Sequence, residues 1–386
     1  MSSSFLPFHR PDIGEAEIES VVETLRSGWL TTGPKAKRLE SDFARYLGVR
    51  HAIAVNSCTA ALHLALEAVG VREGDEVILP TMTFAASAEV VLYLKAKPVL
   101  VDCRADTLNI DAEKVAQAVT KRTKAIMPVH FGGQPCDMNE IMEIARRHDL
   151  KVIEDAAHAL PAQYQGKWIG AIGDATCFSF YATKTITTGE GGMVTTENDE
   201  VAERMRMMSL HGISHDAWKR YTKEGSWYYE ILSPGFKYNL TDIAAAIGIE
   251  QLKKCDELWE ARQRIAMIYR NAFAKFEEIR FPAYRKDVQH AWHLFVIQLN
   301  LERLKIDRNR FIEAMREKEI GTSVHFIPLH LHPYYRDNFG YSTGEFPNAS
   351  KLFQEIVSLP IYPGMTEADV ERVIDAVRTI TRGYRR

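Results

Sequence analysis

The chain of 386 residues carries a formal net charge of −3 at pH 7, and 26% of its residues are charged. This balance argues against a nucleic-acid or anionic-membrane partner, because no basic stripe stands out along the sequence. The length suffices for one large and one smaller domain, and no apolar run matches a signal peptide or a membrane span. The cysteines form no Cys-x-x-Cys pair and predict free thiols in a reducing cytoplasm: Cys58, Cys103, Cys136, Cys177 and Cys255.

The first predicted element is a helix over residues 14–27, where apolar side chains recur at helical spacing. Gly28 ends this helix. The loop Trp29-Leu-Thr31-Thr-Gly33-Pro34 then has a defined shape, because glycine and proline interrupt regular structure. Taken alone, this loop needs no function beyond stiffening the chain.

A turn of small residues joins a predicted buried strand, residues 51–55, to a predicted helix, residues 60–69. In this turn, Asn56-Ser57-Cys58-Thr59, the backbone N–H groups at the helix start can point toward an anion, and the helix dipole favours negative charge there. Serine and threonine are also ordinary capping residues, so a plain capping turn explains the same sequence equally well.

Strand and helix patterns then alternate at the spacing that is typical of a mostly parallel sheet with helices on both faces. The predicted elements are strands 76–79, 98–101 and 125–129 and helices 111–119 and 138–147. Phe84 follows the first of these strands. Its ring could stack on a planar ligand or simply pack in the core.

Two polar side chains follow the next predicted strand, residues 151–155. Asp155 ends the strand, and His158 comes three residues later. Ligands of open parallel sheets bind at the carboxyl ends of the strands, so we expect both side chains to face a ligand. An aspartate at this place suits the protonated pyridine nitrogen of pyridoxal phosphate (PLP), which keeps that coenzyme working as an electron sink.

A lysine stands at the mouth of another strand, which the apolar and aromatic run 177–181 predicts. Aromatic walls remove water from the Lys184 ammonium and lower its pKa, and the free amine can form a Schiff base with an aldehyde. Glycines within residues 189–192 would let the backbone approach a bulky planar ligand. A surface lysine before a glycine hairpin is the alternative that this stretch leaves open.

After the lysine loop, we expect a strand, a helix and a polar, mobile excursion: residues 193–196, 200–209 and 216–226. Asn239 is, from the residues alone, a turn residue. It precedes a nearly continuous helical pattern from residue 242 to about residue 276. This pattern leads into a second domain, so we predict a large domain of residues 1–250 and a small domain of residues 251–386.

The second domain mixes strands and helices, predicted over residues 290–297, 308–318 and 367–380. Its clustered histidines, His325, His330 and His332, invite a metal site. No carboxylate or cysteine completes a ligand set nearby, and Pro328 interrupts any helical face, so we expect no bound metal. Contacts with a substrate or plain loop packing suit these histidines better.

Two motifs together resemble the DegT family of PLP-dependent nucleotide-sugar aminotransferases: Glu154-Asp-Ala-Ala-His158 and Ser179-Phe-x3-Lys184-x4-Gly189-Glu-Gly-Gly. The resemblance runs through nearly the whole chain. It implies an α/β, aspartate-aminotransferase-like (type I PLP) fold, in which a large domain has a mostly parallel mixed sheet between helices and a smaller C-terminal domain is α+β. It also implies a homodimer with shared active sites.

The resemblance assigns a role to each candidate site residue. Lys184 would hold PLP as a Schiff base and move a proton between substrate and coenzyme, a step worth roughly 10²–10⁴ in rate. Asp155 would pair with the pyridinium, and His158 would lie near the ring hydroxyl. Phe84 would lie against the ring. The implied phosphate contacts are Cys58, Thr59 and Ser179, together with Asn239, which would reach the phosphate of the partner subunit's coenzyme. The implied substrate contacts are Thr31, Gly33, His325 and His330.

The implied reaction transfers an amino group from L-glutamate to a keto sugar linked to a nucleoside diphosphate and yields 2-oxoglutarate. The stretches Gly28-Trp-Leu-Thr-Thr-Gly-Pro34, His211-Gly-x3-Asp-Ala-Trp218 and His290-Ala-Trp-His293 look most like the branch that aminates C4 of UDP-linked keto sugars, including the one that forms UDP-4-amino-4-deoxy-L-arabinose. Residues 324–330 depart from that pattern and look closer to acetamido-sugar C4 transaminases.

Three alternative functions make different demands on these residues. A sugar 3-dehydratase of the same family has a histidine where Lys184 stands, so the lysine argues against it. A PLP-binding regulatory protein without turnover would not need lysine, aspartate and phosphate ligands together. An amino-acid transaminase is compatible with the same residues, since glutamate must bind in either case.

Overall fold

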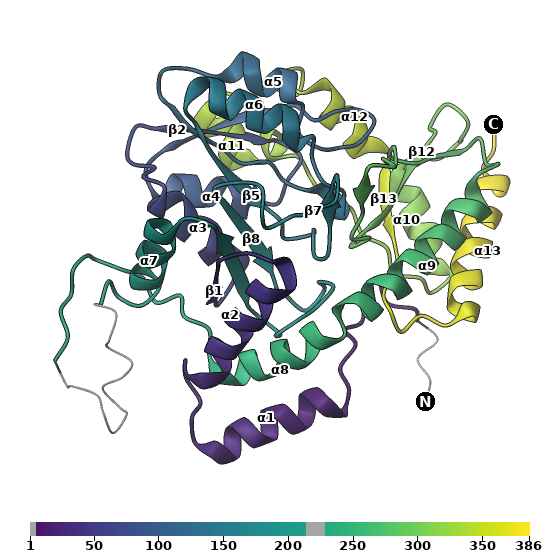
Figure 1. The fold of residues 1–386 in the computed structure, drawn as a ribbon. Coiled ribbons are helices and arrows are strands. Elements are labelled where there is room, and N and C mark those ends of the chain that lie inside the picture. The colour runs from purple at the N-terminus through teal and green to yellow at the C-terminus, as the bar shows by residue number, and fades with distance from the viewer. Residues whose placement is uncertain (1–4, 214–227) are drawn as a thin grey trace.

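The computed structural model describes residues 5–213 and 228–386, and Figure 1 shows a large α/β unit beside a smaller C-terminal unit. Within the described residues, the large sheet has the strand order β1-β9-β8-β5-β4-β2-β3. β9 is antiparallel to both its neighbours, and the other pairs are parallel. The strands are β1 (His51–Val55), β2 (Glu76–Pro80), β3 (Lys97–Val101), β4 (Thr123–Ile126), β5 (Lys151–Asp155), β8 (Ala175–Ser179) and β9 (Gly192–Thr196).

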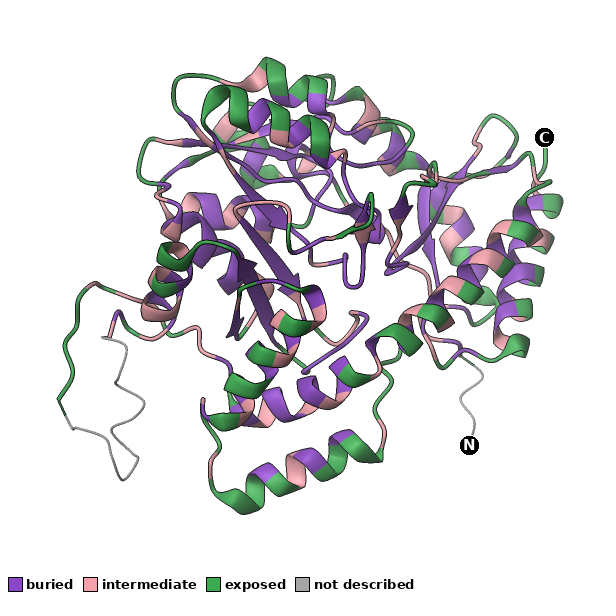
Figure 2. Ribbon diagram, in the orientation of Figure 1, coloured by how far each residue is buried: buried purple, intermediate pink, exposed green. Residues whose placement is uncertain are grey.

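Helices cover both faces of this sheet, so its strands are buried while the helices keep exposed outer faces (Figure 2). Side chains of β8 point alternately into the two resulting clusters, Phe178 into one and Cys177 into the other. One face carries α2 (Pro34–Leu47), α5 (Ala112–Ala118), α6 (Met138–His148) and α8 (Asp242–Lys253), with α1 (Glu15–Ser27) outside α8. The other carries α3 (Cys58–Ala68), α4 (Ala86–Tyr93), α7 (Asp199–Met208), α11 (Pro333–Phe339) and α12 (Pro347–Glu355).

The C-terminal unit has its own core beneath a three-stranded antiparallel sheet in the order β10-β12-β13. Leu6 packs into this core, and its N–H donates to the Glu319 carbonyl at 2.8 Å, so the amino-terminal segment also contributes to it. The elements are β10 (Ile279–Arg280), β12 (Phe295–Leu299), β13 (Ile356–Leu359), α9 (Cys255–Phe273), α10 (Arg308–Glu317) and α13 (Glu367–Gly383). A further small sheet joins β6 (Gln163–Tyr164), β7 (Lys167–Trp168) and β11 (Val288–Gln289), and short 3-10 turns are η1 (Phe131–Gly133) and η3 (Leu329–Leu331).

The predicted fold class is confirmed, with differences at particular elements. Residues 34–47 form α2, a helix that was not predicted because Gly33-Pro34 was interpreted as the end of regular structure. Proline in fact suits the first turn of a helix. The predicted strand 290–297 is wrong in its first half, because Trp292 has a positive φ of 52° and the chain turns before β12. The predicted strand 177–181 begins two residues earlier and ends at Ser179.

Two predictions on chain organisation stay predictions. The domain boundary between residues 250 and 251 falls within α8, and the chain enters the C-terminal unit with α9. The expected excursion at residues 216–226, with the motif ending at Trp218, lies outside the described residues. In the described part of the chain, none of the helices is long and apolar enough to span a membrane.

Candidate active site

The carboxyl ends of the parallel strands meet at one edge of the large sheet. β1 points the same way as β8, because each is antiparallel to β9. The residues that follow these strands are therefore brought to one edge, which is where open sheets bind ligands. They are Cys58 and Thr59 after β1, Phe84 after β2, Asp155 at the end of β5 and Ser179 at the end of β8.

Asp155 is a buried carboxylate, with 5% of its surface exposed. It accepts hydrogen bonds of 2.7 Å from Ser87 Oγ and 3.1 Å from the Ala157 N–H, and Ser87 is held in turn by the Thr83 hydroxyl at 2.7 Å. Burial raises the pKa of Asp155 even with these donors, because a charge is unfavourable in a dry site. A cationic ring nitrogen beside the carboxylate would offset this penalty.

Lys184 lies in the loop after β8, where its backbone N–H donates to the Tyr181 carbonyl at 2.9 Å. Burial lowers the pKa of its amine from 10.5 to about 8; Cys58 and Asp155 act in the opposite direction, and the charge of Arg262 lowers the pKa further. The side chain keeps partial exposure. Lys184 is therefore a reachable lysine with an appreciable fraction of free amine near neutral pH, as a nucleophile requires.

Neutral histidine rings border the lysine. His293 Nε2 is 3.4 Å from Lys184 Nζ, and the His158 ring lies 4.3 Å from the His293 ring and stacks on Phe326 at 5.7 Å. Burial, reinforced by the Lys184 charge, lowers the pKa of both histidines well below the usual range. The Gly132 N–H donates to His158 Nδ1 at 3.3 Å, which leaves the proton of the neutral ring on Nε2.

The turn before α3 serves as a cap and still presents free amides. The Ser57 hydroxyl accepts the Ala60 N–H at 3.0 Å, as the capping interpretation expected. The N–H groups of Cys58 and Thr59 begin the helix and have no partner within it, so they suit an anion such as a phosphate. A Cβ on Gly192 would lie 2.6 Å from the Ser57 carbonyl carbon. A side chain at this position would therefore clash with the turn itself. We had expected glycine here because of the close approach of a ligand.

Phe84 and Ser179 lie at the open side of the same edge. Phe84 is 64% exposed, which is unusual for a large apolar residue, and its ring centroid is 6.1 Å from that of Phe326. Ser179 Oγ accepts the Tyr181 N–H at 3.3 Å, so its hydroxyl proton is available for another acceptor. Stacking by Phe84 and phosphate binding by Ser179 stay predictions that these positions support.

The loop before α2 is bound to the start of α8. The Asp242 carboxylate accepts the Gly33 N–H at 2.7 Å, and the Asp242 N–H donates to the Thr31 carbonyl at 3.1 Å. Asn239 Nδ2 donates to Thr32 Oγ1 at 2.6 Å, so the same loop holds the asparagine. These bonds give the loop a fixed shape. The ligand contacts predicted for Thr31, Gly33 and Asn239 stay predictions.

The two candidate substrate histidines have different surroundings. His325 Nδ1 contacts Ser358 Oγ at 2.9 Å, and burial lowers the pKa of His325 to about 4. His330 is 1% exposed, and its two ring nitrogens contact the Thr81 and Ser350 hydroxyls at 2.8 and 3.0 Å. A substrate contact through His330 would have to replace one of these bonds. Among the described residues, no group of three or more His, Cys, Asp and Glu side chains could hold a metal ion.

Other site residues had been assigned no role. Ser87 orients Asp155, and His293 contacts Lys184 although it was noted only as part of a motif. His9 bonds the Ala182 carbonyl, two residues before the lysine, and burial lowers the pKa of His9 to about 3. Arg262 lies on the apolar face of α9, where a charged residue is rare. A charged residue at an apolar position of the helical pattern was the feature of the sequence that could have identified it.

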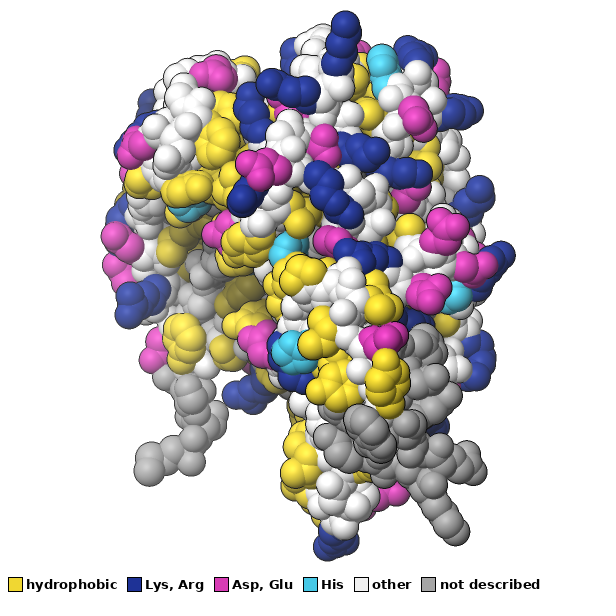
Figure 3. All heavy atoms as spheres, turned by 90° about the vertical axis from the view of Figure 1, so that its left-hand side faces the viewer, with side chains coloured by type: hydrophobic (Ala, Val, Ile, Leu, Met, Phe, Trp, Pro, Cys, Tyr) yellow, Lys and Arg dark blue, Asp and Glu magenta, His cyan; other side chains and the backbone are white. Residues whose placement is uncertain are grey.

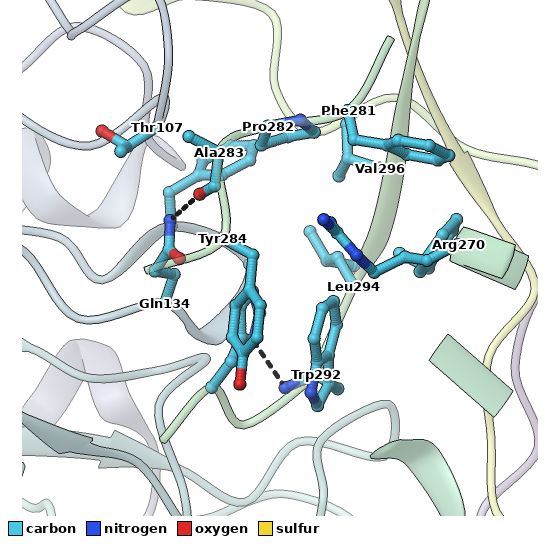
Figure 4. Close-up of a pocket in the computed structure, with 14 residues that line it drawn as sticks. Thr107, Gln134, Arg270, Phe281, Pro282, Ala283, Tyr284, Trp292, Leu294 and Val296 are labelled. Atoms are coloured by element: carbon cyan, nitrogen blue, oxygen red, sulfur yellow. Dashed lines mark hydrogen bonds between the residues drawn. The ribbon is translucent and has the colours of Figure 1, made fainter. Parts of the chain in front are cut away.

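A cavity lies behind Gly132, the residue whose N–H bonds His158 (Figure 4). The Arg270 guanidinium lies 5.3 Å from the Phe281 ring centroid and 5.6 Å from that of Tyr284, and Gln134 donates to the Ala283 carbonyl at 2.9 Å. None of the predicted site residues lines this cavity. The candidate active site is therefore the strand edge around Lys184.

The residues at this edge fit PLP. The coenzyme needs an amine for its aldehyde, a carboxylate for its ring nitrogen and an anion site for its phosphate. Lys184 offers a free amine, Asp155 is a buried carboxylate whose pKa is raised by burial, and the start of α3 offers backbone amides. When PLP is bound, these residues would hold it at those three points.

Comparison with known proteins agrees with this fit. The DegT/DnrJ/EryC1/StrS aminotransferase family model matches residues 11–378. The spore coat polysaccharide biosynthesis protein SpsC of Bacillus subtilis is 51% identical over 380 residues, which cover 98% of each chain. The uncharacterized protein MJ1066 of Methanocaldococcus jannaschii is 56% identical over 377 residues, also 98% of each chain.

Solved structures show the same architecture. The PLP form of Spr1654 from Streptococcus pneumoniae, assigned as a sugar aminotransferase, matches with a TM-score of 0.91 and 35% identity over 98% of this chain and 99% of that one. Helicobacter pylori PseC, an aminotransferase involved in the biosynthesis of pseudoaminic acid, matches with a TM-score of 0.91 and 27% identity over 98% of this chain and 100% of that one. The chain therefore belongs to the DegT/DnrJ/EryC1/StrS aminotransferase family and is a PLP-dependent sugar aminotransferase.

Proposed function

We propose that the protein transfers the amino group of L-glutamate to C4 of a keto sugar linked to a nucleoside diphosphate, and releases 2-oxoglutarate. The observation that carries this proposal is Lys184, a reachable lysine of lowered pKa at the sheet edge that also holds the buried carboxylate of Asp155. The dehydratases of the family have histidine at that position, so the lysine favours transamination. The C4 position rests on the likeness of residues 28–34 and 290–293 to C4-aminating relatives.

Bound PLP supplies an electron sink for the carbon from which a proton is removed. Lys184 Nζ would accept this proton and donate it again, a role that its partly exposed side chain and lowered pKa allow. Asp155, fixed by Ser87 and the Ala157 N–H, holds a proton on the ring nitrogen. His158 Nε2–H would help to orient the bound coenzyme, and Phe84 would pack against it.

The phosphate and substrate contacts follow from the same arrangement. The N–H groups of Cys58 and Thr59 and the Ser179 hydroxyl bind the coenzyme phosphate, and Asn239 reaches the phosphate in the partner subunit. The nucleotide sugar lies against the loop before α2 and the C-terminal histidines. The residues proposed to contact it are Thr31, Gly33, His325 and His330.

We also propose a homodimer in which each active site uses both chains. Figure 3 shows hydrophobic side chains gathered on the face that lies at the left of Figure 1. Phe84, Tyr181, Ile231 and Leu232 are all exposed large hydrophobic residues. Exposed apolar patches mark interaction surfaces, and two-fold dimers are the commonest soluble oligomers.

We place the reaction in the cytoplasm. All five cysteines are free thiols, four of them buried and Cys58 partly buried. Chains with unpaired thiols are typical of reducing compartments.

A panel of keto sugars tests the proposed function. The purified protein with L-glutamate is offered UDP-4-keto-pentose, UDP-4-keto-6-deoxy-N-acetylhexosamine and dTDP-4-keto-6-deoxyglucose, with 2-oxoglutarate and the amino sugar measured together by mass spectrometry. We expect both products in equal amounts from at least one UDP sugar, and neither from the Lys184→Ala variant. If 2-oxo acids are offered as acceptors in place of the keto sugars and only they react, the protein is an amino-acid transaminase. A deoxygenated sugar would indicate a dehydratase.

A further inference from the structure

The η1 turn (Phe131–Gly133) lies directly against His158. The Gly132 N–H donates to His158 Nδ1 at 3.3 Å, and a Cβ on Gly133 would lie 2.8 Å from the His158 carbonyl oxygen. The backbone of the turn therefore contacts this histidine with no room for a side chain between them. A hydrogen bond of 3.3 Å is already long, so a small displacement of the turn would break it.

The same turn also holds the segment that carries His293 to the reactive lysine. The Gly133 carbonyl accepts the Ala291 N–H at 2.9 Å, and the Gly132 carbonyl accepts the Leu294 N–H at 3.1 Å. These two bonds lie on either side of His293 in the sequence, and His293 Nε2 is 3.4 Å from the lysine Nζ. The position of one short turn therefore sets the positions of both histidines.

Packing alone does not keep this turn in place. Phe131, Gly132 and Gln134 line the cavity of Figure 4, so that side of the turn is not closely packed. Gly132 and Gly133 have positive φ values of 63° and 102°, which glycine adopts easily and also leaves easily, because it has no side chain to restrict the backbone. Hydrogen bonds to the turn must therefore supply the rigidity.

Asn109, in the loop between β3 and α5, supplies these bonds. Its Oδ1 accepts the Phe131 N–H at 2.9 Å, and its Nδ2 donates to the carbonyls of Gln134 at 3.0 Å and Pro135 at 2.9 Å. Both hydrogens of the side-chain amide are thus used on the turn and the residues directly after it. Asn109 is 2% exposed, so water cannot readily replace these bonds.

His130 anchors the two ends of the same segment. Its N–H donates to the Asp155 carbonyl at 3.1 Å, and its ring nitrogens contact Glu154 Oε2 at 2.9 Å and the Cys136 N–H at 3.1 Å. These bonds tie the ends of residues 130–136 to β5, whereas Asn109 holds the residues between them. The chain should therefore fold without the Asn109 side chain, with the middle of the segment free to shift.

We propose that Asn109 is a positioning residue for transamination: it holds the η1 turn so that His158 keeps its proton on Nε2 and His293 stays beside Lys184. The inference rests on the proposed function in one respect, namely that His158 acts on the coenzyme. A neutral histidine that has lost the N–H donor to its Nδ1 can carry its proton on either nitrogen. With the proton on Nδ1, the ring can no longer donate from Nε2.

Nitrogen NMR of the histidine rings tests this role, because protonated and unprotonated ring nitrogens resonate far apart. The full-length, PLP-loaded protein is measured as wild type and as Asn109→Ala, and His158→Gln identifies the signals of His158. We expect the Nε2–H tautomer alone in the wild type and a mixture in Asn109→Ala. Asn348→Ala is the matched control, because the Asn348 amide donates to the Cys103 carbonyl of the same loop at 2.8 Å and not to the turn. This control should keep the wild-type tautomer.

The half-reaction with glutamate, followed by the absorbance of the coenzyme, is the second measurement. We expect the rate at saturating glutamate to fall about 10- to 100-fold in Asn109→Ala, since a displacement of about 1 Å at a reacting site can cost this much. The glutamate concentration for half-maximal rate should change little, because the variant disturbs positioning rather than ground-state binding. A merely structural asparagine would lower the melting temperature without changing the rate per coenzyme-loaded site.

The outcomes separate this role from the proposed function. A single Nε2–H tautomer of His158 in Asn109→Ala would overturn the inference, as would an unchanged rate per coenzyme-loaded site. Wild-type protein that does not react with glutamate would contradict the proposed donor, and the tautomer, which is measured without any substrate, would still decide the role of Asn109.

A second variant covers a loss of folding. If melting curves show that Asn109→Ala is unfolded, Asn109→Asp replaces it. The aspartate keeps an acceptor for the Phe131 N–H but has no N–H for the carbonyls of Gln134 and Pro135, so we expect the same mixture of tautomers. An unchanged tautomer in this variant would reject the inference.

Discussion

The two sides of Lys184 are built differently. On the sheet side, Asp155 and His158 follow one strand, and Ser87 and backbone amides already hold their polar atoms. On the other side, the amino-terminal segment, α9 and the loop before β12 bring together His9, Arg262 and His293, and each of these keeps a buried polar atom without a partner in the described chain. The polar atoms of the first side are therefore paired within the chain, whereas several of those on the second side are not.

This difference separates the groups that suit the coenzyme from those that act on the lysine. A coenzyme that stays bound through many turnovers benefits from groups fixed in advance. Variants on the sheet side should therefore affect the coenzyme and the chemistry. On the other side, the charge of Arg262 lowers the pKa of Lys184, so a variant there should affect the titration of the lysine.

Lys184→Ala should have the largest effect, since it removes both the attachment point and the proton carrier. We expect transamination to fall by more than the roughly 10²–10⁴ that a positioned acid–base group contributes alone. Borohydride reduction of the yellow wild-type protein followed by peptide mapping should place the pyridoxyl group on Lys184. Lys167→Ala, at an exposed lysine of β7, should label and react as the wild type does. A pyridoxyl label on any other lysine would contradict the assignment.

Asp155→Asn should have the next largest effect. The amide keeps the shape but cannot hold a proton on the ring nitrogen, so the reaction with glutamate should slow by about 10- to 100-fold, the value of a charged hydrogen bond. The pKa of Asp155 is raised by burial, which means that its ionised form destabilises the folded chain above its ordinary pKa. The melting temperature of coenzyme-free Asp155→Asn at pH 7 should therefore not fall. Near wild-type turnover would remove Asp155 from this role.

The same contrast explains what the sequence could and could not predict. Lys184, Asp155 and the small-residue turn before α3 lie at strand ends, where local patterns and the rules of parallel sheets apply. The α/β architecture was predictable for that reason. The groupings at residues 9, 262 and 293 depend on how the C-terminal unit packs on the sheet, which no local pattern encodes. Similarly, both ring nitrogens of His330 are engaged by hydroxyls distant in sequence.

A smaller effect should come from mixing two inactive variants, Lys184→Ala and Asn239→Asp. If Asn239 serves the partner's coenzyme, half of the randomly exchanged dimers contain one site without either defect, so about a quarter of wild-type activity should return. The carboxylate that Asn239→Asp introduces should repel the coenzyme phosphate, which explains why this variant is inactive alone. The backbone of Asn239 forms an isolated β-bridge with Val55 of its own chain, so the position of the backbone alone does not decide which subunit the side chain serves. Complete failure to regain activity, with subunit exchange verified, would mean that the asparagine serves its own subunit.

The smallest effect should be a shift in the titration of Lys184 when the charge of Arg262 is removed. Burial lowers the pKa of Lys184 to about 8, and the charge of Arg262 adds to this lowering. Removing that charge must therefore raise the pKa toward 10.5, so that the free amine, about half of the total at pH 8 in the wild type, becomes the smaller fraction. At a pH well above 10.5, where the amine is fully deprotonated in both proteins, they should be equally reactive.

Competitive labelling of coenzyme-free protein with acetic anhydride across pH, with peptide mapping, measures this titration at the single lysine. We expect a midpoint near pH 8 in the wild type, a higher one in Arg262→Gln and an unchanged one in Arg262→Lys, which keeps the positive charge. A merely structural arginine would alter melting in both variants without separating their midpoints. Equal midpoints in all three proteins would show that the cation does not act on the lysine, and the two sides of the site would then be electrostatically independent.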